Sequence, residues 1–111
     1  MRAPAELAEK GDGRCAIAGA LTMETAPWLW QQLKAGGLLT TAKEADLAGV
    51  TDADSAGLAL LVAWRGSCAA AGGSLGYRAL PARIMALARL TGAEPALGTD
   101  GAADAAGPSG V

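Results

Sequence analysis

Apolar and small residues alternate in the first part of the chain in the manner of a β-strand. The alternation runs over residues 14–19 and predicts a strand whose inward side chains are either Cys15 and Ile17 or Ala16 and Ala18. The larger pair is the better candidate for burial, because it removes more apolar surface from water.

A helical spacing follows at residues 22–33. Thr22 or Thr25 can cap this helix, since a threonine hydroxyl accepts from a free backbone N–H of the first turn. Pro27 is tolerated only in that first turn, where its missing N–H costs nothing. A pair of glycines beginning at Gly36 ends the helix.

Two tryptophans fall within this predicted helix. Leu29 and Leu33 lie four residues apart and should face the core, with Trp28 or Trp30 beside them. Residues two apart in a helix cannot share one face, so one tryptophan is expected near the surface. A partly buried edge residue is the preferred interpretation of that tryptophan, ahead of a docking contact.

The centre of the chain is a strand, a tight loop and a long helix. The strand is predicted around Glu44–Leu47 and the turn at Gly49–Asp52. Asp54 and Ser55 stand immediately before a long apolar run, and both are N-cap residues. We therefore predict a helix over residues 55–71, with Ser55 at the junction of loop and helix.

The remaining segments are short. Residues 38–43 are predicted to be a loop and 74–77 a strand, and a last helix runs from Pro81 to Gly92. Its inward residues are Ile84, Leu87 and Ala88, and its outward residues are Arg83 and Arg89. Strands that alternate with helices pair in parallel through right-handed crossovers, so the fold class is α/β.

The two ends of the chain are poor in apolar bulk. Residues 2–10 are polar and rich in alanine, and they either add a short first strand or fray. The domain is predicted to cover residues 1–97. Residues 98–111 are predicted to be a disordered tail, because their side chains cannot offset the entropy of ordering.

The two sides of the predicted helix at residues 55–71 differ in bulk. One side carries the residues of a core stripe: Gly57, Leu60, Leu61, Trp64 and Cys68. The opposite side carries no charge: Ser55, Ala59, Val62, Ala63, Gly66 and Ala70. A helix that is apolar all round is usually covered on both sides, so this second side is predicted to bind a protein. The alternative is that the alanines only reflect the composition of the chain and helix propensity.

The composition argues against several classes of function. The chain has 111 residues, no histidine and a formal net charge of −2. Without a cluster of Lys and Arg, nucleic acid is not expected as a partner. The chain has no histidine, no nucleophile elbow and no phosphate-binding loop, so we expect neither enzymatic activity nor a bound cofactor. Asp46, Asp52 and Asp54 lack the glycine and terminal glutamate of a calcium loop, so no metal is expected either.

Cysteine usage and hydropathy indicate a location. Cys15 and Cys68 stand in apolar surroundings without a Cys-x-x-Cys spacing, so we expect buried free thiols and a reducing compartment. Residues 1–10 do not read as a signal peptide, and no uncharged apolar stretch is long enough to span a bilayer. A cytoplasmic protein without direct membrane insertion is predicted.

The sequence D-L-A-G-V-T-D-A-D-S-A-G-L-A-L-L, at residues 46–61, resembles the signature of STAS domains, the fold of bacterial anti-sigma factor antagonists. The resemblance covers residues 11–97. It is closer to one branch, the small cytoplasmic STAS subunit of the Mla phospholipid-transport ABC transporter. The segments that support this branch are residues 11–12 with 16–21, the Trp28 and Trp30 segment, and residues 84–92.

The resemblance implies a fold and a function. It implies a single STAS domain with a four- to five-stranded, mixed or mostly parallel sheet and helices mainly on one face. It also implies a non-catalytic accessory subunit that binds the transporter's ATPase subunit and supports its assembly or activity at the inner membrane. The residues expected to bind the partner are Asp54, Ser55, Ala59, Val62, Ala63 and Gly66. A homodimer is left open.

The anti-sigma factor antagonists imply a different function. In them the serine of the Asp-Ser pair is phosphorylated by a partner kinase, and phosphorylation changes binding. Ser55 occupies that position, where the transporter branch more typically carries threonine. The alternative function is therefore a partner-switching regulator controlled through Ser55. A third interpretation is that Ser55 only caps the helix.

Overall fold

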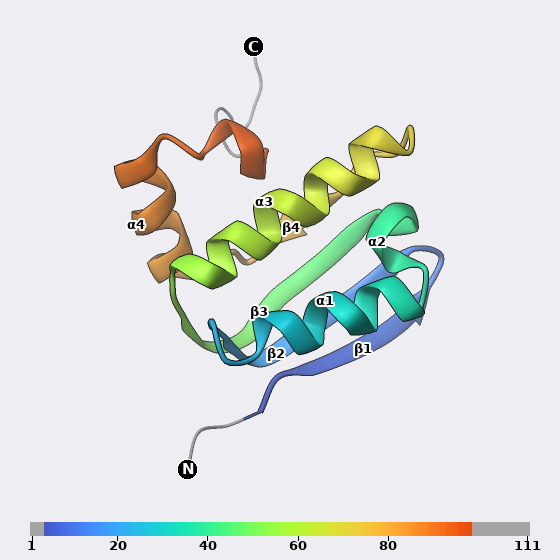
Figure 1. Cartoon of the computed structure of the whole chain (residues 1–111), viewed down its shortest axis with the longest axis horizontal. Coiled ribbons are helices and arrows are strands. Elements are labelled where there is room, and N and C mark those ends of the chain that lie inside the picture. The colour runs from blue at the N-terminus through green and yellow to red at the C-terminus, as the bar shows by residue number, and fades with distance from the viewer. Residues whose placement is uncertain (1–3, 99–111) are drawn as a thin grey trace.

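The computed structural model describes residues 4–98, whose helices and strands alternate along much of the chain (Figure 1). The elements are β1 (Glu6–Gly11), β2 (Arg14–Leu21), α1 (Ala26–Ala35), α2 (Leu38–Thr41), β3 (Glu44–Ala53), α3 (Ser55–Ala70), β4 (Gly76–Arg78), α4 (Ala82–Thr91) and the 3-10 helix η1 (Pro95–Leu97). The predicted tail lies outside the described residues except for Gly98.

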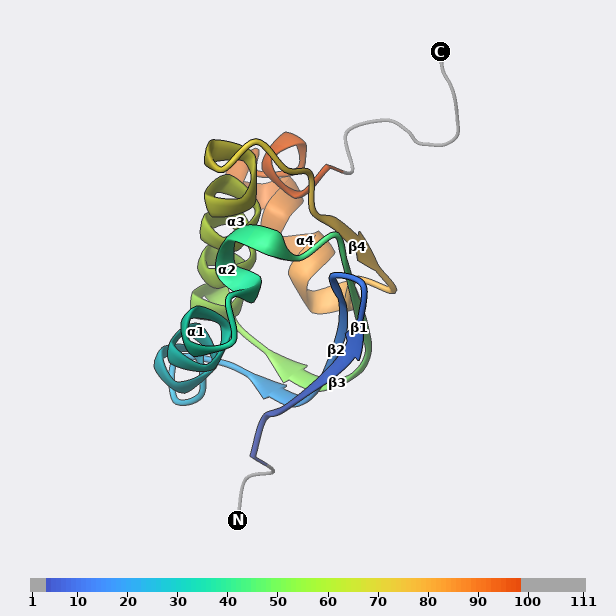
Figure 2. The same cartoon turned by 90° about the vertical axis from the view of Figure 1, so that its right-hand side faces the viewer.

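The strands form one four-stranded sheet in the order β1-β2-β3-β4. β1 is antiparallel to β2, whereas β3 is parallel to both β2 and β4. The sheet is therefore mixed, and the predicted α/β class is confirmed. Figure 2 shows the helices gathered on one side of the sheet, with α3 alongside α1 and α2. The N-terminal segment, left open as strand or frayed end, contributes the edge strand β1.

The core forms between the inner face of the sheet and α3. Cys15 and Ile17 are buried, whereas Ala16 and Ala18 are partly exposed, which confirms the larger pair as the inward one. The predicted core stripe of α3 is buried along its whole length. Trp64 is fully buried at its centre, because its indole Nε1 donates to the Leu38 carbonyl at 2.9 Å and leaves no polar atom unpaired.

The expectations for the two tryptophans of α1 are confirmed. Leu29 and Leu33 are fully buried. Trp30 is partly buried against the core, and Trp28 is 45% exposed. The helix begins at Ala26 rather than at residue 22, because Thr22 forms a turn first. The Thr25 hydroxyl lies at the N-cap position but donates to the Ala20 carbonyl at 2.8 Å, so it ties the turn to β2 instead of capping the helix.

The predicted turn at Gly49–Asp52 is wrong, because β3 continues to Ala53. The segment pairs with β2 at every residue except Thr51, through partners that include Ala18 with Gly49 and Leu21 with Ala53. Two register shifts absorb the irregularity that the glycine signals. A segment whose sequence is typical of a turn is therefore held in a strand by pairing with its neighbour β2.

The predicted loop at 38–43 is also wrong, since it contains the one-turn helix α2. Gly37 adopts a left-handed φ of 79° and redirects the chain after α1. The Thr41 hydroxyl then donates to the Gly37 carbonyl at 2.8 Å and closes the turn. The short helix places Leu38 against α3, where its carbonyl receives the Trp64 indole.

The last third of the chain follows the prediction with small shifts. β4 begins at Gly76 rather than at residue 74. α4 has Pro81 at its N-cap and Gly92, with a φ of 71°, at its C-cap. Ile84 and Ala88 are buried, as predicted, and Leu87 is partly buried.

Both cysteines are buried free thiols, as predicted, and one of them makes stability depend on pH. Burial raises the pKa of the Cys15 thiol from 9.0 to about 11, and the Glu9 carboxylate adds to the effect. Because the pKa is higher in the folded state, this thiol's contribution to stability is complete below pH 9 and is lost as the pH rises towards 11.

We expect the free energy of unfolding to fall by about 2 kcal/mol on this account between about pH 8 and 10.5, as measured by urea denaturation. Burial also raises the pKa of Cys68 and of Tyr77, so other groups add to the alkaline loss. The Cys15→Ala variant should show a shallower fall than the unmodified chain. Equal slopes in the two proteins would contradict a contribution from Cys15.

Candidate partner-binding site at the start of helix α3

The N-terminus of α3 is capped by Asp54. Its backbone is extended, and its Oδ1 atom accepts from the backbone N–H of Ala56 at 2.9 Å and of Gly57 at 3.2 Å. Of the two predicted N-cap residues, Asp54 therefore holds the cap and Ser55 does not. Ser55 is the first helical residue, and it is exposed. Its hydroxyl is thus not needed for the cap.

The same aspartate joins two loops. Its Oδ2 atom accepts from the backbone N–H of Met23, in the β2–α1 loop, at 3.1 Å. Its own backbone N–H donates to the Leu21 carbonyl at 3.3 Å. These bonds hold Met23 beside the start of α3, where the residue is 71% exposed. Sequence reasoning did not single out Met23, because nothing local places it next to a helix thirty residues later.

We expect Asp54→Ala to lower the free energy of unfolding by about 1–2 kcal/mol, because three backbone N–H groups lose a charged acceptor. Chemical denaturation measures the change. Asp52→Ala is the matched control, since the exposed Asp52 carboxylate makes no hydrogen bond or ion pair with the described residues. The control should stay within about 0.5 kcal/mol of the unmodified chain. Equal losses in the two variants would contradict the capping role.

The outward side of α3 carries no charge at any exposed position. We call this side the α3 face, and its residues are Ser55, Ala59, Val62, Ala63, Gly66, Ala69 and Ala70. Val62 is half-buried and the others are exposed. The face includes the predicted partner-binding residues except Asp54, which lies at its edge, and it adds Ala69.

The only charged residue within α3 is directed away from this face. Arg65 donates through Nε to the Leu75 carbonyl at 2.9 Å and through a terminal nitrogen to the Ala96 carbonyl at 3.4 Å. The guanidinium thus holds the segment before β4 and the η1 helix against α3. It is a structural group, and it leaves the α3 face without charge.

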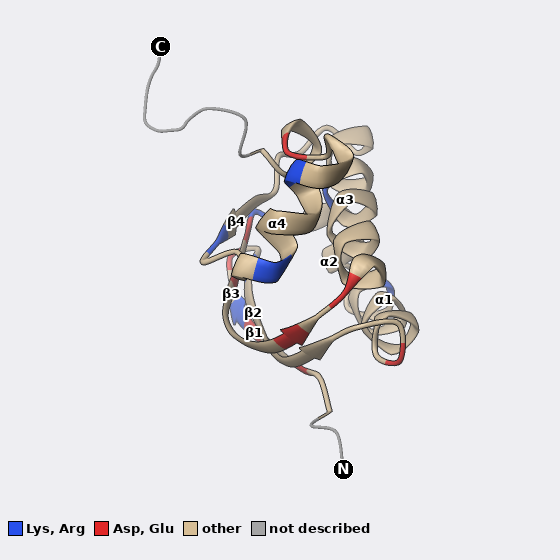
Figure 3. Cartoon of the chain, turned by 90° about the vertical axis from the view of Figure 1, so that its left-hand side faces the viewer, with Lys and Arg blue, Asp and Glu red and all other residues tan. Residues whose placement is uncertain are grey.

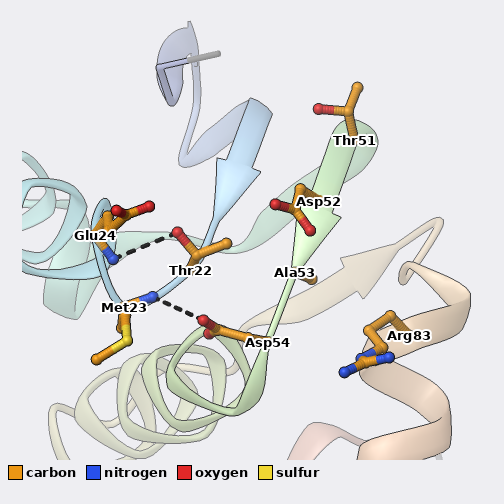
Figure 4. Close-up of a pocket in the computed structure, with 8 residues that line it drawn as sticks. All are labelled: Thr22, Met23, Glu24, Thr51, Asp52, Ala53, Asp54 and Arg83. Carbon is orange, nitrogen blue, oxygen red and sulfur yellow. Dashed lines mark hydrogen bonds between the residues drawn. The ribbon is translucent and has the colours of Figure 1, made fainter. Parts of the chain in front are cut away.

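An open cavity of about 620 Å³ lies beside the first turn of α3 (Figure 4). It is bounded by the end of β3, the β2–α1 loop and the start of α4. Its lining residues are Thr22, Met23, Glu24, Thr51, Asp52, Ala53, Asp54 and Arg83. Sequence reasoning predicted Arg83 to face outward but could not place it here, because α4 reaches this point only through the fold.

The charges at this end of the molecule are unevenly distributed. Figure 3 shows acidic positions at the end of β3 and the start of α3, with basic positions on α4.

Within residues 4–98, no group of three His, Cys, Asp or Glu side chains is arranged to hold a metal ion. No helix in the same range is long and apolar enough to cross a membrane.

Comparison with known proteins identifies the architecture. A family model described as "Mlab, STAS domain" matches residues 6–98. Among solved structures, the chain is similar to the murine Solute Carrier 26 family member A9 (Slc26a9) anion transporter in the inward-facing state. The TM-score is 0.57 and the identity 14%, over 85% of this chain and 19% of that one. The chain thus spans about a fifth of that transporter, and at this identity the likeness shows the fold alone. No curated protein matches the chain.

Proposed function

The chain belongs to the STAS domain family described as Mlab, and on this premise we propose that it is the accessory subunit of a phospholipid-trafficking ABC transporter. In this proposal it binds the nucleotide-binding ATPase subunit and supports the assembly or activity of that subunit. STAS domains are generally non-enzymatic interaction modules, which agrees with a non-catalytic role. The ATPase would then hold the protein at the cytoplasmic side of the inner membrane.

The observation that carries the proposal is the uncharged α3 face. An exposed helix surface normally holds charged or long polar side chains, and the other long helices follow that rule. α1 exposes Gln31, Gln32 and Lys34, and α4 exposes Arg83 and Arg89. An alanine-rich composition should affect all three helices alike. Because only α3 lacks charged and long polar side chains on its exposed side, a surface covered by a partner explains this face better than a bias of composition.

The shape of the α3 face suits a protein partner. Its side chains are small, so the backbone of another helix can approach closely and bury them with little loss of side-chain entropy. Beyond its own helical backbone and chain neighbours, Gly66 has no atom within 4 Å of the position where a Cβ would stand, so the surface is open there. The exposed Met23 adds a flexible apolar group at the edge, of the kind that adapts to a partner.

The proposal is tested by expressing the full chain together with the ATPase and permease subunits of the transporter from the same organism. We expect the chain to co-purify with the ATPase, and its omission to reduce the yield or the ATP turnover of the assembled complex. The purified chain alone should hydrolyse no ATP above background. An ATPase that assembles and turns over equally well without the chain, and never retains it, would refute the proposed function.

A second function, the partner-switching regulator, is favoured by one observation. Ser55 is exposed at the first residue of α3, so a kinase could reach its hydroxyl without unfolding the helix. The free N–H groups of the first turn favour a phosphate there. Asp54 already occupies two of those groups, and a phosphate beside it would meet like charge.

Ser55 substitutions separate the two functions. Because Asp54 holds the cap, Ser55→Ala should change the free energy of unfolding by less than about 0.5 kcal/mol and should keep the partner bound. Ser55→Glu should weaken binding about tenfold or more, since it places a charge on an apolar contact. Mass spectrometry of extracts should find no phosphorylated Ser55. Stoichiometric phosphorylation in cells would instead favour the regulator.

A further inference from the structure

We propose that two copies of this chain associate through the free edge of β1, so that their sheets join across a two-fold axis. The two β1 strands run antiparallel, with Ala8 of one copy opposite Ala8 of the other. This inference goes beyond the proposed function and does not depend on it. None of the residues involved belongs to the α3 face, so each copy keeps that face for its other partner.

β1 is an edge strand of the described sheet, because it pairs with β2 on one side only. Its residues are exposed except Leu7, which is half-buried. An edge strand presents unpaired backbone N–H and C=O groups, to which a second strand can bond. The ladder with β2 is irregular only between Glu9 and Gly11, so residues 6–9 offer a regular strand to a second copy.

The charges of β1 are complementary to themselves under this symmetry. Glu6 and Lys10 lie two residues on either side of Ala8, so antiparallel pairing about Ala8 sets Glu6 of each copy opposite Lys10 of the other. Both charged residues are exposed, and neither makes an ion pair with the described residues. Opposite charges on directly opposed residues stabilise a strand pair, and like charges destabilise it.

The same charges disfavour other arrangements of the two strands. Parallel pairing in register sets Glu6 opposite Glu6 and Lys10 opposite Lys10. A slip of the antiparallel register by one residue can set Glu6 opposite Glu9. Each of these arrangements places like charges opposite each other, whereas pairing about Ala8 forms two ion pairs. The sequence of β1 therefore selects the two-fold register.

The α1 helix extends this edge on the helix side of the sheet. Near its start, Trp28 lines a cavity of about 370 Å³ together with Pro4 and Ala5, the residues that precede β1. Just past its end, the Glu9 carboxylate lies 2.9 Å from the position where a Cβ of Gly36 would stand. α1 therefore follows β1 along its length, as Figure 1 shows.

The row of α1 that is directed to this edge is exposed and carries no charge. It consists of Trp28, Gln32 and Gly36, which lie at successive spacings of four residues, and Trp28 is 45% exposed. Antiparallel pairing brings the start of α1 in one copy towards Gly36 and Gly37 of the other. Beyond its chain neighbours, Gly37 has no atom within 4 Å of the position of a Cβ, so this end has room for an indole ring. Tryptophan is among the residues that contribute most to protein interfaces.

The inference is tested by sedimentation velocity of the purified full chain from micromolar to millimolar concentration. An edge of six residues is smaller than a standard interface, so we expect a dimer that dissociates on dilution. Raising the salt concentration should favour the monomer, because the ion pairs are exposed. Glu6→Lys and Lys10→Glu should each raise the Kd of the dimer at least tenfold, since each opposes like charges twice. Trp28→Ala should raise it about tenfold.

Mixing the two charge variants tests the register. In a mixed dimer, both charged positions are basic in the Glu6→Lys copy and acidic in the Lys10→Glu copy, so both ion pairs form again. We therefore expect two variants that are monomeric alone to dimerise when mixed. Asp52→Lys and Arg83→Glu are the controls for net charge, because both residues are exposed and lie outside β1 and α1. Each control should dimerise as the unmodified chain does.

Three results would overturn the inference. A chain that stays monomeric up to millimolar concentration would refute the dimer. Dimerisation that neither charge variant weakens would show that another surface is the contact. Two monomeric variants that fail to pair on mixing would refute the two-fold register about Ala8. These measurements use no ATPase subunit, so their failure leaves the proposed function untouched.

Discussion

Replacing Gly57 with alanine is expected to lower the free energy of unfolding by about 3 kcal/mol, although alanine is the better helix former. A Cβ atom at this position would stand 2.2 Å from the Leu21 carbonyl oxygen and 2.9 Å from the Leu21 Cγ atom. The first contact is with backbone, so no side-chain rotation relieves it. The start of α3 must instead move away from the end of β2.

That movement has a second cost. The Leu21 carbonyl accepts the Asp54 N–H, and the Asp54 carboxylate accepts the Gly57 N–H. Separating α3 from β2 strains both bonds, so part of the cap is lost together with the packing. The close approach explains why a glycine stands in the buried stripe of a helix, where its conformational freedom is otherwise unfavourable.

Gly66→Ala is the matched control for this prediction. Gly66 belongs to the same helix and is exposed, and no atom beyond its chain neighbours and its own helical backbone lies within 4 Å of the added Cβ. The substitution should therefore raise the free energy of unfolding by about 0.5–1 kcal/mol. Urea denaturation measures the change in the free energy of unfolding for both variants, and the two changes should have opposite signs. A loss at Gly66, or a gain at Gly57, would contradict the close contact between α3 and β2.

The parts of the fold that could be predicted from the sequence are those fixed by local pattern. The two-residue alternation of β2 identified Cys15 and Ile17 as inward, and the helical spacing of α3 identified the stripe around Trp64 as buried. The α3 face was visible for the same reason, because a helix of this length assigns every residue to a side. Pro81 and Gly92 marked the two ends of α4 correctly.

The parts that could not be predicted depend on segments far apart in the chain. β3 continues through Gly49 only because β2 supplies pairing partners along its length. Asp54 rather than Ser55 caps α3, because two distant residues hold Asp54 in place. The Leu21 carbonyl accepts its backbone N–H, and the Met23 N–H donates to its carboxylate. Both residues are N-cap formers, so composition alone could not choose between them. The cavity likewise exists only where three distant segments meet.

Replacing Ala63 with arginine is expected to weaken binding of the ATPase subunit at least a hundredfold while leaving the isolated domain folded. Ala63 is exposed on the α3 face, so a long side chain can extend into water in the free protein. In the complex the same guanidinium is buried without a counter-charge, or it holds the two helices apart. Either outcome should weaken binding by several kcal/mol, which corresponds to a hundredfold or greater rise in Kd.

Ala86→Arg places the same side chain at an exposed position of α4, a helix that already carries Arg83 and Arg89 on its surface. It should bind the ATPase as the unmodified chain does, because α4 lies outside the α3 face. Circular dichroism and chemical denaturation establish that both variants are folded, and titration calorimetry gives their Kd values. Unchanged affinity for Ala63→Arg would show that the α3 face is not the contact. Equal weakening of the two variants would mean that added positive charge, rather than the α3 face, determines binding.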